Sequence, residues 1–212
     1  MSRPSPPAEP MSDRPSDEEL ARRAQGGCRA SFEELTRRFQ VPLLHFLSRW
    51  ADREDAEDLV QDTLVRAYEN LDRYRPAWRF ATWLFTIARR LSMNLKRRRR
   101  PRADGEAMAA VEDRSPGPGV QAAANEGRER LWSAAAEVLT EPQMTATWLY
   151  YVEEMPIKEI ARVVGCSQVA AKISLFRARK RLMPVLRPWQ PGGAHEAVDP
   201  PGKPASCRAN VE

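Results

Sequence analysis

The segment from Pro76 to Arg102 combines positive charge with aromatic side chains. It contains nine Lys and Arg residues and no Asp or Glu, and two Trp and two Phe residues stand within its first ten positions. Cationic side chains neutralise phosphates, whereas aromatic rings stack on unpaired bases. This combination indicates a polyanionic partner with exposed bases.

The segment before it has the opposite character. Between Asp17 and Arg75, thirteen acidic residues stand against ten basic ones. Asp58, Gln61 and Asp62 are spaced i, i+3 and i+4, so they share one exposed stripe of a helix. An acidic stripe repels DNA but complements a basic protein surface. The competing interpretation is an ordinary solvated helix face.

These side chains need a helical framework, and the apolar residues predict one. Apolar positions recur with the helical period over Ser31–Trp50, Asp55–Asp72 and Thr82–Arg99. Pro42 predicts a bend in the first of these helices. The loop Arg73–Arg79 joins the second and third helices and holds three arginines and two aromatic residues. We therefore expect an all-α first domain.

A helix-turn-helix pattern follows further along the chain. A short amphipathic helix ends at Val164, Gly165 suits a left-handed C-cap, and Ser167 suits the N-cap of a longer helix that runs to about Arg187. Such a motif places its second helix in the major groove of DNA, with basic flanks toward phosphates. Two further helices are expected before it, at Arg128–Leu139 and at Gln143–Glu153.

Composition divides the chain into five parts. Residues 1–16 are rich in Pro and Ser and are expected to be disordered, as is the tail at 188–212. Residues 17–100 and 128–187 are the two helical domains. Residues 101–127 carry Pro, Gly and Ala without an apolar face and predict a flexible linker. The expected fold class is all-α, with two small helical domains on a tether.

Other classes of protein receive little support. No apolar run approaches the roughly 18 residues of a membrane span, and the N-terminus lacks the apolar core of a signal peptide, so we expect no membrane insertion and a cytoplasmic location. Three distant cysteines and two histidines in 212 residues show no metal-ligand spacing. We expect no metal and no cofactor. An enzyme is the least favoured class, because no nucleophile–base set or phosphate loop is recognisable.

Three segments in order resemble the extracytoplasmic-function (ECF) sigma factors of bacteria, a two-domain group of the sigma-70 superfamily. They are Asp55–Thr63, Phe80–Arg89 and Ile157–Leu182, and the resemblance spans about residues 17–186. It implies that 17–100 is sigma domain 2 and 128–187 is sigma domain 4. The implied function is to bind core RNA polymerase, at its clamp helices and flap, and to direct promoter-specific initiation without catalytic activity. Regulation by an anti-sigma protein is also implied.

The resemblance also assigns roles to individual residues. Asp58, Gln61 and Asp62 would bind core polymerase. The loop Arg73–Arg79 lies where family members hold a flipped −10 base. The −10 element would be contacted by Arg73, Tyr74, Arg75, Trp78, Arg79, Trp83, Arg89, Arg90, Lys96 and Arg97. The −35 element would be contacted by Ser167, Gln168, Lys172, Phe176, Arg177 and Arg179.

The chain departs from the family pattern at several of these places. Arg90 stands where many members have Asn, which predicts a changed −10 preference. In the second helix of the motif, the usual Thr-Val-Lys-Ser-Arg is replaced by Ala170–Ser174, so that Ile173 stands where Ser is usual and Ser174 where Arg is usual. We expect altered or weakened −35 recognition and an intact fold.

Two other functions compete with this interpretation. A stand-alone helix-turn-helix regulator with an unrelated helical sensor domain would bind a duplex operator tightly without polymerase. An adaptor protein would use both domains for protein contacts, but it leaves the basic, acid-free segment Pro76–Arg102 unexplained.

Overall fold

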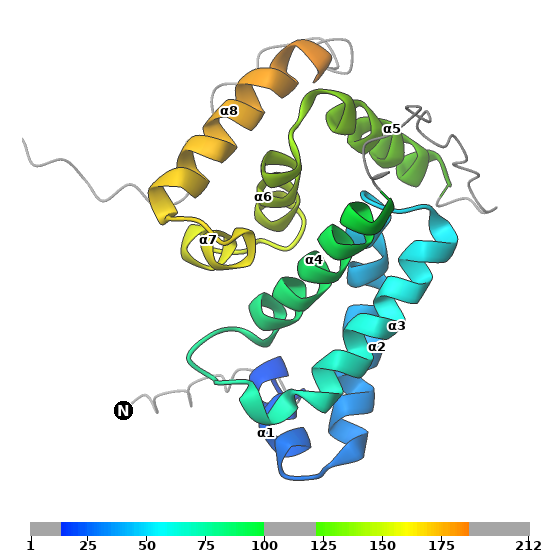
Figure 1. The fold of residues 1–212 in the computed structure, drawn as a ribbon, viewed down its shortest axis with the longest axis vertical. Coiled ribbons are helices and arrows are strands. Elements are labelled where there is room, and N and C mark those ends of the chain that lie inside the picture. Colours follow the sequence, from blue (N-terminus) through cyan, green and yellow to red (C-terminus); the bar gives the residue numbers. More distant parts are fainter. Residues whose placement is uncertain (1–13, 100–121, 187–212) are drawn as a thin grey trace, which may run out of the picture.

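The structure, a computed structural model, describes residues 14–99 and 122–186, and most of these residues are helical. Within these ranges no strand occurs, which confirms the expected all-α class. The helices are α1 (Asp17–Gln25), α2 (Arg29–Leu47), α3 (Arg53–Glu69), the short 3₁₀ helix η1 (Leu71–Arg73), α4 (Phe80–Arg99), α5 (Ala122–Val138), α6 (Glu141–Tyr151), α7 (Ile157–Val164) and α8 (Gln168–Leu186) (Figure 1).

The expected tails and most of the expected linker lie outside the described residues. At the N-terminus, residues 14–16 are described, and Ser16 caps α1 through a hydrogen bond from the backbone N–H of Glu19 to its Oγ (3.2 Å). Helix α5 begins at Ala122, inside the range 101–127 expected to form the linker. That part of the expectation is corrected, because 122–127 is helical.

The first domain packs α1–α4 around one apolar core. Asp52 caps α3 through its carboxylate, which accepts a hydrogen bond from the N–H of Asp55 (3.0 Å). The helix turns Ala56, Leu59 and Val60 inward. The rings of Phe46 and Phe85 meet edge to face, with centroids 5.3 Å apart, between α2 and α4. This core fixes the exposed faces of α3 and α4.

Helix α2 is continuous through Pro42, and the bend expected there stays a prediction. Two other details of this domain differ from the expectations. Tyr68 follows the helical period of the apolar residues of α3, yet it is 56% exposed and meets only the ring of Phe32, with centroids 5.0 Å apart, among the ring contacts of the described residues. Helix α1 was not expected, although Ser16 and the acidic first turn after it form a capping signature.

The second domain contains the predicted helix-turn-helix. Gly165 ends α7 in the left-handed conformation (φ 75°), and Ser167 caps α8 by accepting the backbone N–H of Ala170 (3.1 Å), so both predictions are confirmed. Ala171, Leu175 and Ala178 form the buried face of α8 against α6 and α7. The rings of Trp132 and Trp148 join α5 to α6, 4.8 Å apart.

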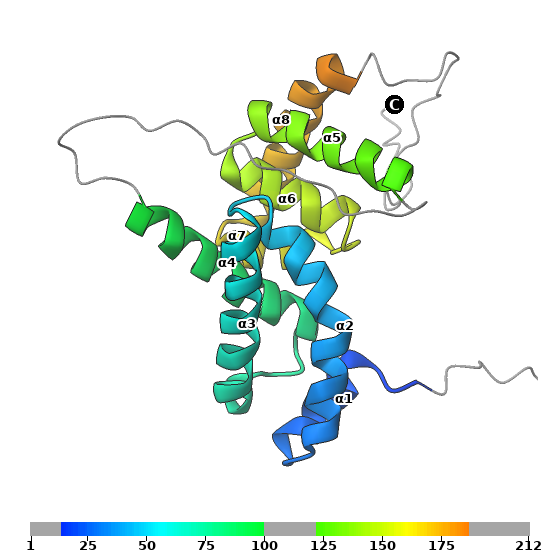
Figure 2. The same ribbon diagram turned by 90° about the vertical axis from the view of Figure 1, so that its right-hand side faces the viewer.

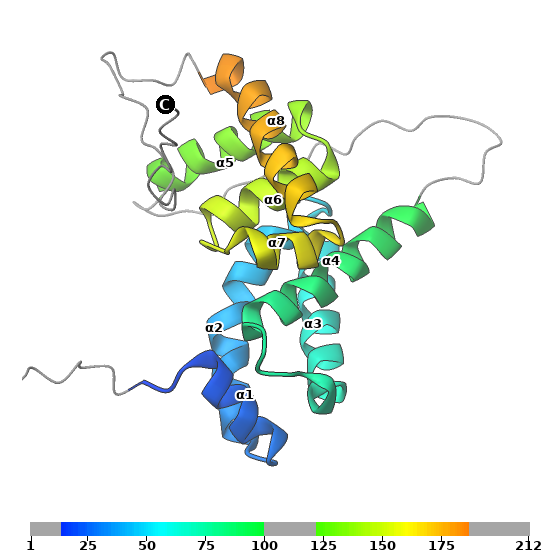
Figure 3. The same ribbon diagram turned by 90° about the vertical axis from the view of Figure 1, so that its left-hand side faces the viewer.

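The two domains pack against each other. Helix α7 lies on α4, as Figures 2 and 3 show from opposite sides, while α8 lies on the side of its domain away from α2 and α3. The sequence predicted two domains on a tether and gave no indication of this contact. It covers part of the helix that carries the predicted −10 residues.

Candidate nucleic-acid interface

The acidic stripe of α3 faces solvent. Asp58, Gln61 and Asp62 are all exposed, because Leu59 and Thr63 turn the opposite side of the helix into the core. Thr63 completes this burial by donating its hydroxyl to the carbonyl of Leu59 (2.6 Å). The three predicted polymerase-binding residues therefore lie together on one surface.

The end of α4 presents the basic residues in two groups. Arg90, Lys96 and Arg97 are exposed. Arg99 instead pairs with the carboxylates of Asp52 (3.4 Å) and Asp55 at the start of α3. This pairing anchors the end of α4 to α3, whereas Lys96 and Arg97 are exposed.

Helix α1 holds the loop between α3 and α4 in place. The amide of Gln25 donates to the carbonyls of Leu71 (2.8 Å) and Tyr74 (3.0 Å), and the carboxylate of Glu18 accepts the N–H of Phe80 (3.1 Å). Sequence patterns missed both residues, because their partners are 46 or more positions away in the chain. Within the loop so fixed, the three arginines Arg73, Arg75 and Arg79 are exposed.

Tyr74, a predicted −10 residue, is buried in the structure. Its ring is 1% exposed, and its hydroxyl donates to the carbonyl of Trp78 (2.9 Å). Burial raises the pKa of Tyr74 to about 12. In this structure Tyr74 shapes the loop from the inside and is not placed to touch DNA. Trp83 is half-buried, with its ring 5.5 Å from that of Tyr74 and 5.6 Å from that of Phe80.

Two further predicted −10 residues contact the second domain. The ring of Trp78 lies under the cations of Lys158 (4.8 Å) and Arg162 (4.3 Å) of α7. The guanidinium of Arg89 pairs with the carboxylate of Glu141 through two hydrogen bonds of 2.9 and 3.0 Å. Thr82, buried in α4, donates its hydroxyl to the carboxylate of Glu159. With the domains in contact, Trp78 and Arg89 are occupied by α6 and α7.

The predicted −35 residues lie along α8. Gln168, Lys172, Phe176 and Arg177 are exposed. Arg179 is held by the domain itself: its Nε donates to the hydroxyl of Tyr151 (2.7 Å), and its guanidinium lies over the ring of Tyr150. Ser167 caps the helix, so its hydroxyl already has a structural role. The structure thus brings five of these six residues to the surface and holds Arg179 beside the tyrosines.

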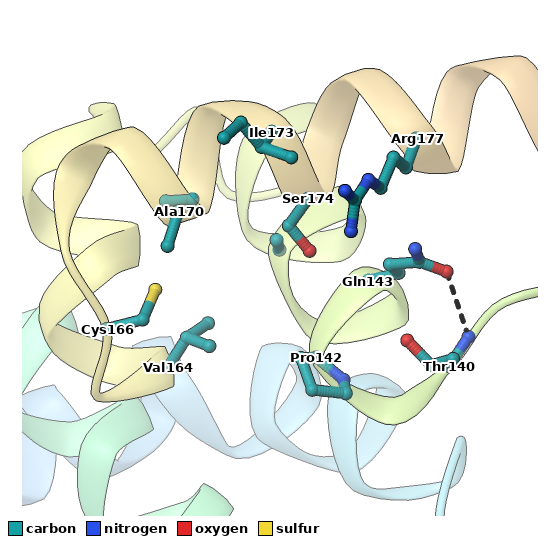
Figure 4. Close-up of a pocket in the computed structure, with 11 residues that line it drawn as sticks. Thr140, Pro142, Gln143, Val164, Cys166, Ala170, Ile173, Ser174 and Arg177 are labelled. Carbon is teal, nitrogen blue, oxygen red and sulfur yellow. Dashed lines mark hydrogen bonds between the residues drawn. The ribbon is translucent and has the colours of Figure 1, made fainter.

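A shallow groove runs between α6 and the first turns of α8 (Figure 4). It is lined on one side by Pro142 and Gln143 and on the other by Ile173, Ser174 and Arg177. The carboxamide of Gln143 closes the capping box of α6 by accepting the N–H of Thr140 (3.2 Å). Ser174 is half-buried here, whereas Ile173 is 44% exposed.

No cluster of His, Cys, Asp and Glu suited to a metal ion occurs in the part of the chain that the structure describes. None of the described helices has the length and apolar character needed to cross a bilayer. Burial raises the pKa of the Cys166 thiol, which disfavours its thiolate form.

Comparisons with known proteins match both domains. Residues 22–102 match the family model of Sigma-70 region 2, and residues 130–182 match that of Sigma-70 region 4. The ECF RNA polymerase sigma-E factor of Escherichia coli is 28% identical over 191 residues, covering 84% of this chain and all of the relative. That of Haemophilus influenzae is 26% identical over 187 residues, covering 84% of this chain and 99% of the relative.

Solved structures show the same fold. CnrH, solved in complex with the cytosolic domain of CnrY, superposes with a TM-score of 0.62 and 29% identity, over 80% of this chain and 96% of CnrH. The sigma factor RpoE of Bartonella quintana, solved with the anti-sigma factor NepR, has a TM-score of 0.56 and 24% identity, over 74% of this chain and 96% of RpoE.

An acidic helix beside a basic one, followed by a helix-turn-helix, is the arrangement of a two-domain transcription initiation factor. The matches to regions 2 and 4 occur in that order and cover both helical domains. The chain belongs to the sigma-70 family, and its relatives place it in the ECF group. Its function is that of an RNA polymerase sigma factor in transcription initiation.

Proposed function

We propose that this sigma factor docks on core RNA polymerase through Asp58, Gln61 and Asp62 and on promoter DNA through α4 and α8. The observation that carries the proposal is the separation of charge. The exposed stripe of α3 is acidic, whereas the exposed end of α4 is basic and every charged residue of α8 is Lys or Arg. Two surfaces of opposite sign on one small protein serve a protein and a polyanion at the same time.

The −10 contacts divide by their position in the structure. The exposed loop arginines (Arg73, Arg75 and Arg79) would flank an unpaired base of the −10 strand. Arg90, Lys96 and Arg97 are exposed further along α4 and would contact phosphates of the DNA backbone. Trp83 borders the same loop. Contacts from Trp78 and Arg89 require the second domain to move away, because α7 engages Trp78 and Glu141 of α6 engages Arg89. The protein has no catalytic role in this scheme.

The −35 contacts come from the exposed part of α8. Gln168 and Lys172 lie in its first turns, which face base edges in a helix-turn-helix complex, and Arg177 follows one turn later. The small size of both domains gives each a limited interface, so tight promoter binding needs the assembled holoenzyme. Two solved relatives are complexes with partner proteins, one of them named an anti-sigma factor, and we propose a regulator of that kind here.

The test is binding to purified bacterial core RNA polymerase. Wild-type protein is compared with Asp58→Arg/Asp62→Arg, and with Glu33→Arg/Glu137→Arg, which makes the same change of net charge at exposed sites outside the stripe. Reversal in the stripe should weaken binding by about 3 kcal/mol or more, over a hundredfold, since close interfacial charge pairs couple with about 1.5–7 kcal/mol. Equal binding of both double variants would exclude the stripe as the docking surface. No binding by the wild type would favour a stand-alone regulator.

A further inference from the structure

The outward face of α8 carries an apolar stripe at its N-terminal half. Val169, Ile173 and Phe176 are 66%, 44% and 67% exposed. Their spacing of four and three residues places them on one side of the helix, opposite the buried Ala171 and Leu175. Single exposed apolar residues are ordinary on protein surfaces, but three on the same face of a helix form a continuous apolar stripe.

The surroundings of this strip are cationic. Lys172 and Arg177 border it on its two sides, and Lys180 continues it toward the C-terminus. From Gln168 to Leu186 the helix contains no Asp or Glu. A strip that is apolar in the middle and positive at its edges matches the major groove of a duplex, where phosphates line the walls and thymine methyl groups project from the floor.

We infer that Val169, Ile173 and Phe176 recognise thymine C5-methyl groups in the −35 element. The inference rests on the proposed function, in which the first turns of α8 enter the major groove. Ile173 is the central residue, since it replaces a hydroxyl-bearing residue in the usual family pattern with a β-branched hydrocarbon. Ser174, the neighbouring departure, is half-buried beside Gln143 and faces the groove of Figure 4.

The alternative occupant is an apolar helix of a partner protein. The positive borders and the absence of any carboxylate on α8 favour a polyanion over such a helix. The stripe also lies on the first turns of the second helix of the motif, the part that reaches base edges in helix-turn-helix complexes. Apolar side chains there cannot form hydrogen bonds with the base edges, but burying thymine methyl groups against them is favourable for binding.

The experiment uses holoenzyme assembled from the full chain and purified core polymerase. A duplex library randomised in the −35 region first selects the preferred element. Each thymine of that element, on either strand, is then replaced by deoxyuridine, which removes the methyl group and keeps the base pair. Each contacted methyl should contribute about fourfold to holoenzyme affinity in competition binding.

Variants assign the effect to the stripe. Holoenzyme with Ile173→Ser or Val169→Ser should lose the preference for thymine over deoxyuridine at the position that the replaced side chain contacts. Met183→Ser is the matched control, because Met183 is exposed to a similar extent (64%) but lies beyond the turns that enter the groove. It should keep the full sensitivity to deoxyuridine.

The outcomes separate this inference from the proposed function. In one outcome, the holoenzyme requires the −35 element and yet binds with the same affinity when deoxyuridine replaces thymine at every position. That result would overturn the inference alone and would favour a protein partner for the apolar stripe. A selected element made of G·C pairs would overturn it as well. A wild-type chain that fails to assemble with core polymerase would overturn the proposed function and the inference with it.

Discussion

Arg89 of α4 and Glu141 of α6 form a bidentate ion pair between the two domains. Their side chains are 11% and 19% exposed, and the Nε–Oε1 and Nη2–Oε2 distances are 2.9 and 3.0 Å. Glu141 also accepts the hydroxyl of Thr145 (3.0 Å) and stands in the first turn of α6, where a negative charge is favourable. A residue expected at the −10 DNA is therefore part of the contact that holds the domains together.

Reversing the charge of Arg89 should open this contact. Loss of one partner of a buried ion pair costs about 3–5 kcal/mol, because the other charge remains buried and unpaired. We expect Arg89→Glu to increase the radius of gyration in small-angle X-ray scattering, and Arg89→Glu/Glu141→Arg to restore the wild-type value. Arg90→Glu makes the same charge change at an exposed neighbour and should leave it unchanged. If Arg89→Glu stays as compact as wild type, the pair does not hold the domains together.

Lys96 and Arg97 should set the salt dependence of promoter binding. Each phosphate contact contributes about 0.7–0.9 to the slope of log affinity against log salt concentration. Holoenzyme with Lys96→Ala/Arg97→Ala should therefore show a slope smaller by about 1.4–1.8, with similar losses on different promoter sequences. Arg99→Ala is the control, because Arg99 is already paired with Asp52 and Asp55. An unchanged slope in the double variant would place both side chains away from DNA.

The fold should require Gly165 because of its backbone conformation, and not because a larger side chain would clash. A Cβ at this position would have no heavy atom within 4 Å, yet the residue has φ 75°. Gly165→Ala should lower the free energy of unfolding by about 1–2 kcal/mol, the cost of a left-handed conformation, measured by chemical denaturation. Asn tolerates this conformation better, so Gly165→Asn should lose less. Equal losses for the two variants would point to a cause other than the backbone.

Glu153 should make the second domain less stable as the pH rises. Burial raises the pKa of this carboxyl, although the indole of Trp148 donates to it at 3.4 Å. Because the folded pKa lies above the unfolded one, stability is greatest below the unfolded pKa and falls as the pH rises through the folded pKa. Glu153→Gln keeps the acceptor and removes the charge, so it should raise the melting temperature at pH 7 and lose that advantage in acid. A gain that persists at low pH would contradict this assignment.

Short-range sequence patterns were enough to locate most of the helices and to indicate the family. Helical periodicity located the cores of α2, α3 and α4, and Gly165 with Ser167 fixed the turn of the helix-turn-helix, because caps and amphipathic stripes depend on residues only a few positions apart. The exposed stripe of Asp58, Gln61 and Asp62 followed from the same short-range spacing. Helix ends differed from prediction by a few residues, and α1 was missed altogether.

Tertiary structure alone decided what covers each side chain. Tyr74, expected at DNA, is a core residue of the loop, and Trp78 and Arg89 are engaged by α6 and α7. The hold of Gln25 and Glu18 on the loop was equally invisible. These contacts of Glu18, Gln25, Trp78 and Arg89 join residues 46 or more positions apart. A side chain's type and local spacing do not encode which distant surface will bury it. Periodicity tells which face of a helix is apolar, whereas packing decides which polar and aromatic groups remain exposed.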